Sequence, residues 1–191
     1  MPASSSKGQP SATVTQDPPR LLRLEAFCQR HELIVVLVLC ALAATRVFLF
    51  SAAFPPFDNV DEHHHLDTVC HYANGEVPDG LVGFSEDAIG LISVYGSPEY
   101  MAAPGLQIPP PIWSLPPDVR AQLESRIGDE FRNMRNHEST SPPVYYAVAA
   151  LWYRLGAAIG LSGGRLFYWV RFLNVLLVAL LVWYGQAFVA K

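Results

Sequence analysis

Charged side chains are scarce in this sequence of 191 residues, and acidic ones are absent from its C-terminal part. Only 16% of the residues are charged, whereas 51% are apolar. Residues 142–191 contain no Asp or Glu, while residues 55–141 contain fourteen of them and four Arg, a net charge of −10. A soluble globular protein mixes both signs over its surface, and a nucleic-acid-binding protein needs a basic patch without competing acids. The charge distribution excludes both classes.

Cysteine is also rare, with three residues at positions 28, 40 and 70. Only Cys70 lies in the acidic segment 55–141, so no disulfide framework can form within that segment. No two cysteines have the CxxC spacing of a zinc knuckle.

Long apolar runs are what the sequence has instead. Residues 33–54 contain a single charge, Arg46, and residues 142–161 and 166–190 form two further runs joined by a short Gly-rich turn. At about 1.5 Å per residue, runs of this length cross a hydrocarbon core of about 30 Å. The sequence therefore predicts a multi-pass, α-helical integral membrane protein with three transmembrane helices. A cleaved signal peptide ending near Ser51 is the rival interpretation, and the long leader before residue 33 favours an uncleaved anchor.

Basic residues next to the apolar runs predict the orientation, because cytoplasmic flanks are enriched in Lys and Arg. The residues that place two flanks in the cytoplasm are Arg20, Arg23, Arg30 and Arg165. The N-terminus is then cytoplasmic, and residues 1–32, which begin with a Ser- and Pro-rich stretch, form a disordered cytoplasmic tail. Residues 55–141 become an extracytoplasmic loop between the first and second spans.

This loop is too long for a simple connection and is expected to be partly helical. One helix is predicted from a cap at Asp58 or Asn59 to Gly75. A second is predicted over Asp118–Met134, where apolar residues recur every four positions. Residues 81–113 show no clear period and receive no assignment.

The residues with chemical potential lie in the first of these helices. Asp61 and His65 are four residues apart, so a carboxylate and an imidazole can touch and share a proton. His63, Asp67 and His71 also recur every four residues, a spacing that suits a divalent metal ion. A solvated, acidic helix N-terminus is the third interpretation.

Glu138 stands at the other end of the loop, a few residues before the double proline that opens the second apolar run. It is placed above the same membrane face as Asp61. Acidic residues from the two ends of the loop are therefore predicted to converge.

Several short elements occur together in an order that resembles the N-terminal part of the GT-C membrane glycosyltransferases. They are an apolar span, Pro55-Pro56-x-Asp58, Asp61-Glu62-x-x-His65, Gly75-x-x-Pro78, Glu138, Pro142-Pro143-x-Tyr145-Tyr146 and Arg171. The superfamily includes protein O-mannosyltransferases, aminoarabinose transferases and many bacterial relatives. The resemblance covers about residues 33–190.

The resemblance implies sugar transfer from a polyprenyl-phosphate carrier to an acceptor at the outer face of a membrane, expected here to be a bacterial cell membrane. By matching position Asp61 is the catalytic base, with Glu62 beside it and His65 in support. No cofactor is firmly implied, although a divalent metal fits the His63, Asp67 and His71 interpretation. Arginines on the outer side are expected to hold the departing phosphate, and the loop offers Arg120, Arg126, Arg132 and Arg135.

Family members carry more spans, so the sequence is expected to be an N-terminal portion that works with further transmembrane segments or a partner subunit. Two non-enzymatic alternatives stay open. One is a metal-binding membrane protein, and the other is an assembly subunit whose polar residues face partner helices. Those residues are Arg46, Arg154, Arg171 and Asn174.

Overall fold

The computed structural model describes residues 30–58, 61–96 and 110–189, and most of them are helical. The elements are α2 (Glu32–Ala53), α3 (Glu62–Ala73), β1 (Val82–Gly83), α4 (Glu86–Tyr95), the 3₁₀ helix η1 (Ile112–Ser114), α6 (Pro117–Arg132), β2 (Arg135–Asn136), the 3₁₀ helix η2 (His137–Thr140), α7 (Pro143–Ala158) and α8 (Gly163–Val189). The predicted helical class is confirmed. The predicted disordered tail lies outside the described residues as far as residue 29.

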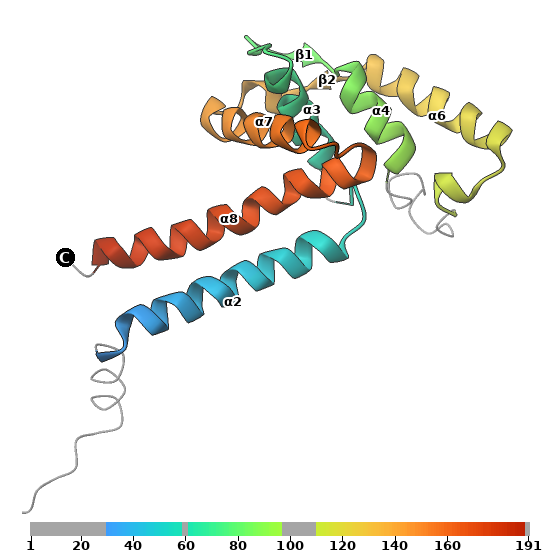
Figure 1. Ribbon diagram of the computed structural model, residues 1–191. Coiled ribbons are helices and arrows are strands. Elements are labelled where there is room, and N and C mark those ends of the chain that lie inside the picture. The colour runs from blue at the N-terminus through green and yellow to red at the C-terminus, as the bar shows by residue number, and fades with distance from the viewer. Residues whose placement is uncertain (1–29, 59–60, 97–109, 190–191) are drawn as a thin grey trace, which may run out of the picture.

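Helices α2 and α8 form an antiparallel pair that extends away from the rest of the molecule (Figure 1). The start of α2 lies beside the end of α8, where Glu32 and Gln186 line one shallow cavity. Farther along the pair, the rings of Phe48 and Phe172 pack with their centres 5.2 Å apart. This helical pair joins residues that are more than a hundred positions apart in the sequence.

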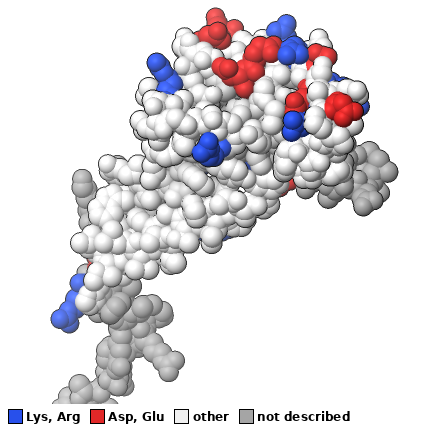
Figure 2. All heavy atoms as spheres, turned by 45° about the vertical axis from the view of Figure 1, so that its right-hand side comes forward, with Lys and Arg blue, Asp and Glu red and all other residues white. Residues whose placement is uncertain are grey.

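Both helices of the pair are long and apolar enough to cross a membrane. Only 6% of the apolar window of α2 and 17% of that of α8 are buried within the protein, so neither is a core helix. Figure 2 shows the charged side chains gathered on the rest of the molecule, while the helical pair is almost free of them on this face. Its exposed large apolar side chains include Leu33, Ile34, Leu37, Val38, Leu42, Leu49, Leu176, Leu180 and Leu181.

The second predicted span, residues 142–161, forms α7, which has only 16 residues and packs against the first half of α8. The rings of Trp152 and Trp169 stack 4.2 Å apart, and each indole N–H donates to the backbone carbonyl of the other residue, at 2.7 and 2.8 Å. Helix α7 is not one of the two described helices long and apolar enough to cross a membrane. A third span therefore stays a prediction.

One expectation about orientation does not agree with a membrane-crossing pair of α2 and α8. Arg30 adjoins the start of α2, and Arg165 lies in the first turn of α8. Because α2 and α8 are antiparallel with the start of one beside the end of the other, these arginines lie at opposite ends of the pair. They cannot both flank the same membrane face if both helices cross it.

The remaining elements, α3 to α7, form a head at the end of the helical pair (Figure 1). Its main core joins α3, α4, the α2–α3 connection and the start of α8. The buried members of this core are Phe57, Leu66, Cys70, Phe84, Ala88, Ile89, Ile92 and Phe167. The start of α8 therefore anchors the head to the pair.

Both helices predicted within the acidic segment are present, with shifted starts. Helix α3 begins at Glu62 instead of near Asp58, and α6 begins at Pro117, one residue before the predicted cap. The proline fits the first position of a helix because that position needs no backbone N–H donor. Asp118 therefore lies in the first turn of α6 and does not cap it.

Helix α4 was not predicted. It begins after Ser85, whose hydroxyl oxygen accepts the N–H of Ala88 at 3.3 Å, a regular N-terminal cap. One face of this short helix, with Ile89 and Ile92, is buried in the head core. The strands β1 and β2 pair antiparallel, with Val82 opposite Asn136, and so hold the stretch between α3 and α4 against the C-terminal end of the acidic segment.

Candidate acid–base site where α3 begins

Glu62, the first residue of α3, forms a two-pronged ion pair with Arg171 of α8. Arg171 donates from Nε and Nη2 to the two carboxylate oxygens, both at 2.6 Å. The same guanidinium donates to the carbonyl oxygens of Ser51 at 3.1 Å and Pro55 at 2.8 Å, at the end of α2. Glu62 also accepts the N–H of Phe57 at 2.8 Å. Glu62 thus joins α2, α3 and α8, and its carboxylate is fully engaged.

Asp61 precedes Glu62 and is much more accessible, with 53% of its side chain exposed. Its carboxylate lies 3.7 Å from Nε2 of His137, which comes from η2 at the other end of the acidic segment. The same nitrogen lies 3.9 Å from the carboxylate of Glu138. The predicted convergence of Asp61 and Glu138 is present in the structure, with His137 between them.

His65 does not pair with Asp61 as its spacing suggested. Its Nδ1 lies 2.7 Å from the hydroxyl of Tyr146 on α7, and that hydroxyl donates to the Glu138 carboxylate at 2.9 Å. The hydrogen bond from the Ser141 hydroxyl, at 2.6 Å, is the main cause that holds the pKa of Glu138 below its ordinary value. Glu138 is therefore a carboxylate anion at neutral pH.

Sequence reasoning did not place Tyr146 or His137 in the site. Tyr146 is 3% exposed, and an aromatic residue near a predicted span reads most simply as membrane-interface packing. The available signal was the position of Tyr146 three residues after the double proline that follows Glu138.

A cavity of about 260 Å³ lies beside this site, between α3, α7 and α8. Its polar walls carry Glu62, His65, Tyr145, Arg171 and Asn174, and its apolar walls carry Leu66, Val69, Phe167 and Val170. Asp61 is not among the lining residues.

The predicted metal site is not formed in the structure. His71 directs Nδ1 to the Glu76 carboxylate at 2.7 Å and Nε2 to the Gly83 carbonyl at 3.1 Å. Both partners only accept hydrogen bonds, so both ring nitrogens are occupied within the protein, and the pKa of His71 is raised above its ordinary value, which disfavours the free lone pair that a metal needs. Burial lowers the pKa of His63 to about 4, and its ring packs on other aromatic rings. Among the described residues, no group of three or more His, Cys, Asp and Glu side chains is arranged to hold a metal ion.

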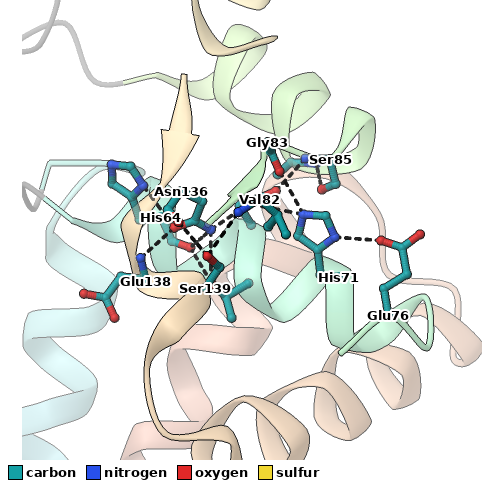
Figure 3. Close-up of polar contacts among 12 residues, drawn as sticks. His64, His71, Glu76, Val82, Gly83, Ser85, Asn136, Glu138 and Ser139 are labelled. Atoms are coloured by element: carbon teal, nitrogen blue, oxygen red, sulfur yellow. Dashed lines mark hydrogen bonds and ion pairs between the residues drawn. The ribbon is translucent and has the colours of Figure 1, made fainter. Parts of the chain in front are cut away.

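Asp67, the remaining predicted ligand, belongs to a buried polar network shown in part in Figure 3. Asp67 is 0% exposed and accepts the N–H of Ser85 and the amide of Asn136, both at 2.7 Å. Asn136 of β2 also accepts hydrogen bonds from His64 and from the N–H of Glu138 on one oxygen (Figure 3). This network fixes η2, and with it Glu138, relative to α3.

The arginines expected to hold a phosphate belong to the α6–β2 part of the head. Arg132 pairs with Glu86 and Asp129, both at 2.9 Å, and Arg120 pairs with Glu124 at 3.6 Å. Arg126 lies on α6 as well, and Arg135 on β2. The arginine that lines the cavity is Arg171.

Comparison of the chain with protein-family models, curated proteins and solved structures finds no match. The chemistry of the site therefore has to be argued from its geometry. Two carboxylates and two histidines lie together directly beyond the end of α2, and one histidine lines a small polar cavity. Such a group can take up and release protons.

Proposed function

We propose that this chain is an integral membrane protein whose helices α2 and α8 cross the bilayer as an antiparallel pair. The support is that both helices are long, apolar and largely exposed, while the charged side chains gather on the head. The head then lies outside the membrane beyond Ala53, and the start of α2 and the end of α8 face the cytoplasm.

Helix α7, the third predicted span, lies against the outer lipid leaflet in this proposal. Its first turn is level with Asn174 of α8, because the hydroxyl of Tyr145 donates to Asn174 at 3.4 Å. Its exposed apolar stripe consists of Val144, Val148, Leu151, Leu155 and Ile159.

The proposed activity is glycosyl transfer from a polyprenyl-phosphate sugar to a hydroxyl acceptor at the outer face of a bacterial cell membrane. The observation that carries it is the convergence of Asp61 and Glu138 next to the end of α2. A base removes the proton of the acceptor hydroxyl, whose oxygen attacks the anomeric carbon while the lipid phosphate leaves. Asp61 is the base indicated by the resemblance to the GT-C enzymes, and its exposed carboxylate is accessible to an acceptor.

The test is an assay of transfer from polyprenyl-phosphate mannose, labelled in the sugar, by membranes that contain the full-length protein. Asp61→Asn should lower the rate at least about a hundredfold, the usual size of a general-base contribution. Asp129→Asn is the matched control, because Asp129 is an exposed carboxylate of α6 that pairs with Arg132. Near-normal transfer by Asp61→Asn removes Asp61 from the base role, and no transfer by the unaltered protein from this and other polyprenyl-phosphate sugars refutes the activity.

An assembly role is the second candidate, favoured by Arg46. This arginine is exposed in the membrane-crossing part of α2, where its guanidinium lies 5.9 Å from the centre of the Phe50 ring. A charge at that depth is costly unless it reaches the interface or meets a polar partner. A partner helix with an acidic residue would supply one. Cross-linking in native membranes that recovers only monomer counts against this role.

A further inference from the structure

The hydrogen bonds around His65 determine which of its nitrogens carries the proton. The Glu138 carboxylate accepts only, so the Tyr146 hydroxyl uses its one proton to donate to it. The Tyr146 oxygen must then accept from His65, at 2.7 Å, and Nδ1 of His65 is the protonated nitrogen. Nε2 keeps its lone pair, and it has no hydrogen-bond partner among the residues that the structure describes.

The surroundings make this arrangement stable. Tyr146 is 3% exposed and packs in the contact of α3 with α7 and α8, so its hydroxyl has a fixed position. The Glu138 carboxylate lies only 3.6 Å from Nδ1 of His65, close enough to stabilise a positive charge on that ring. The other charged or titratable groups near the ring are Glu62 on α3, Tyr145 on α7 and Arg171 on α8, which line the same cavity, and His63 on α3, whose pKa is lowered in part by His65.

His65 also lines the cavity of about 260 Å³, and its imidazole can accept a proton there, whereas the guanidinium of Arg171 cannot. Glu62 shares that wall, but its carboxylate is held by Arg171 and the N–H of Phe57. The volume is below the range of about 300–1,000 Å³ typical for drug-sized ligands. The amide of Asn174 and the hydroxyl of Tyr145 suit a small ligand with several hydroxyl groups, such as one sugar unit.

We propose that His65, and not Asp61, takes the proton of an acceptor hydroxyl bound in this cavity, because His65 lines the cavity and Asp61 does not; Tyr146 and Glu138 are positioning residues. The proposal rests on the proposed function. The acceptor O–H bond breaks and an Nε2–H bond forms. The electron pair of the broken O–H bond stays on the acceptor oxygen, which attacks the anomeric carbon. The bond from that carbon to the lipid phosphate oxygen breaks, and its electron pair leaves with the phosphate. In the resulting imidazolium, the Nδ1–H group still donates its hydrogen bond to the Tyr146 oxygen, and the nearby Glu138 anion compensates the positive charge.

The first experiment is independent of activity. ¹⁵N NMR of ring-labelled histidine in the full chain, reconstituted in lipid, should show the neutral ring of His65 with Nδ1 protonated and Nε2 unprotonated. His65→Gln assigns the signal. Tyr146→Phe should abolish the preference for this tautomer. An Nε2-protonated ring, or a tautomer unchanged in Tyr146→Phe, overturns the proposal whether or not glycosyl transfer is found.

The second experiment uses the transfer assay with polyprenyl-phosphate mannose. His65→Gln should lower the rate at least about a hundredfold, and Tyr146→Phe should lower it about tenfold, the loss expected from one hydrogen bond. Tyr146→Phe should also shift the acidic limb of the pH–rate profile, which a purely structural loss would not do. His31→Gln is the control, because His31 lies at the far end of α2.

The two experiments separate the possible failures. The predicted tautomer without any transfer refutes the proposed function and, with it, the role of His65 as a base. Transfer that survives His65→Gln but is lost in Asp61→Asn overturns the proposal and leaves the function intact. Transfer that survives Asp61→Asn but is lost in His65→Gln supports it, as does loss in both together with the shifted profile.

Discussion

Replacing Asn136 by alanine tests whether the buried polar network holds the acid–base site together. Asn136 is 0% exposed. Its side-chain amide donates to three oxygens of α3, which belong to His64, Asp67 and Thr68 and lie at 3.0, 2.7 and 3.0 Å. Its oxygen accepts the N–H of Glu138 at 2.9 Å. One side chain therefore connects β2 and η2 to about one turn of α3.

The expected loss follows from what the truncation leaves behind. The hydrogen bond to the Asp67 carboxylate contributes about 1.5–3 kcal/mol, and the neutral ones contribute about 1 kcal/mol each. Asp67 stays buried after the change, with the N–H of Ser85 as its closest remaining donor at 2.7 Å. The bonds are not additive, so we expect Asn136→Ala to lower the free energy of unfolding by about 3–5 kcal/mol.

Asn133→Ala is the matched control, because Asn133 is exposed and donates to one backbone carbonyl, that of Asp129, at 2.7 Å. It should cost about 0.5 kcal/mol or less. Both variants are measured by urea unfolding in detergent micelles, followed by far-UV circular dichroism. A loss for Asn136→Ala within about 1 kcal/mol of the control refutes the reasoning, because a buried carboxylate deprived of its donor must cost more.

Two other parts of the fold give sharp predictions in the same assay. A Cβ atom at Gly156 of α7 would lie 2.5 Å from the indole of Trp169, so Gly156→Ala should lower the free energy of unfolding by about 1–3 kcal/mol. Gly90→Ala in α4 meets nothing within 4 Å and should instead stabilise by about 0.5–1 kcal/mol; the same sign for both variants contradicts the packing described. Burial alone would lower the pKa of His71, but its hydrogen bond to Glu76 prevails, and the pKa lies above the ordinary value of 6.5. The resulting stabilisation is full below the ordinary pKa and disappears as the pH rises through the raised pKa of the folded protein. His71→Gln should therefore lower the free energy of unfolding more at about pH 5.5 than at about pH 8.5. Equal losses at the two pH values would show that His71 is not the titrating group.

Sequence patterns predicted the elements that depend on local information. The apolar runs gave α2 and α8, and the four-residue spacing gave α6. Helix α4 was not predicted because its buried face is only a few residues long and lies in a stretch rich in glycine and proline. The residues that this face packs against come from elsewhere in the chain. The sequence did not indicate that Arg30 and Arg165 lie at opposite ends of the helical pair, because charge statistics describe each flank separately and do not include the pairing of α2 with α8.

The sequence singled out residues that lie in the candidate site, and it did not indicate which contacts they make. Spacing of four residues on a helix shows only that Asp61 and His65 can meet. The partners they have in the structure, His137 and Tyr146, lie more than seventy positions away and arrive through the β1–β2 pair and through α7. The predicted metal site did not take these distant contacts into account either. Both ring nitrogens of His71 bond to acceptors outside its own helix, Glu76 and the Gly83 carbonyl.

The adjacent acidic residues Asp61 and Glu62 have different roles at the start of α3. Glu62 is held in an ion pair, and Asp61 stays accessible. Successive residues on a helix point about 100° apart, so two neighbouring carboxylates cannot face the same partner. Arg171 holds Glu62 and at the same time satisfies carbonyl groups at the end of α2, which places a fixed positive charge where that helix dipole is negative. The start of α3 is thereby fixed at the end of the helical pair. Asp61 stays exposed, and His65 lies beside Glu62 on the wall of the cavity, where the proton chemistry is proposed.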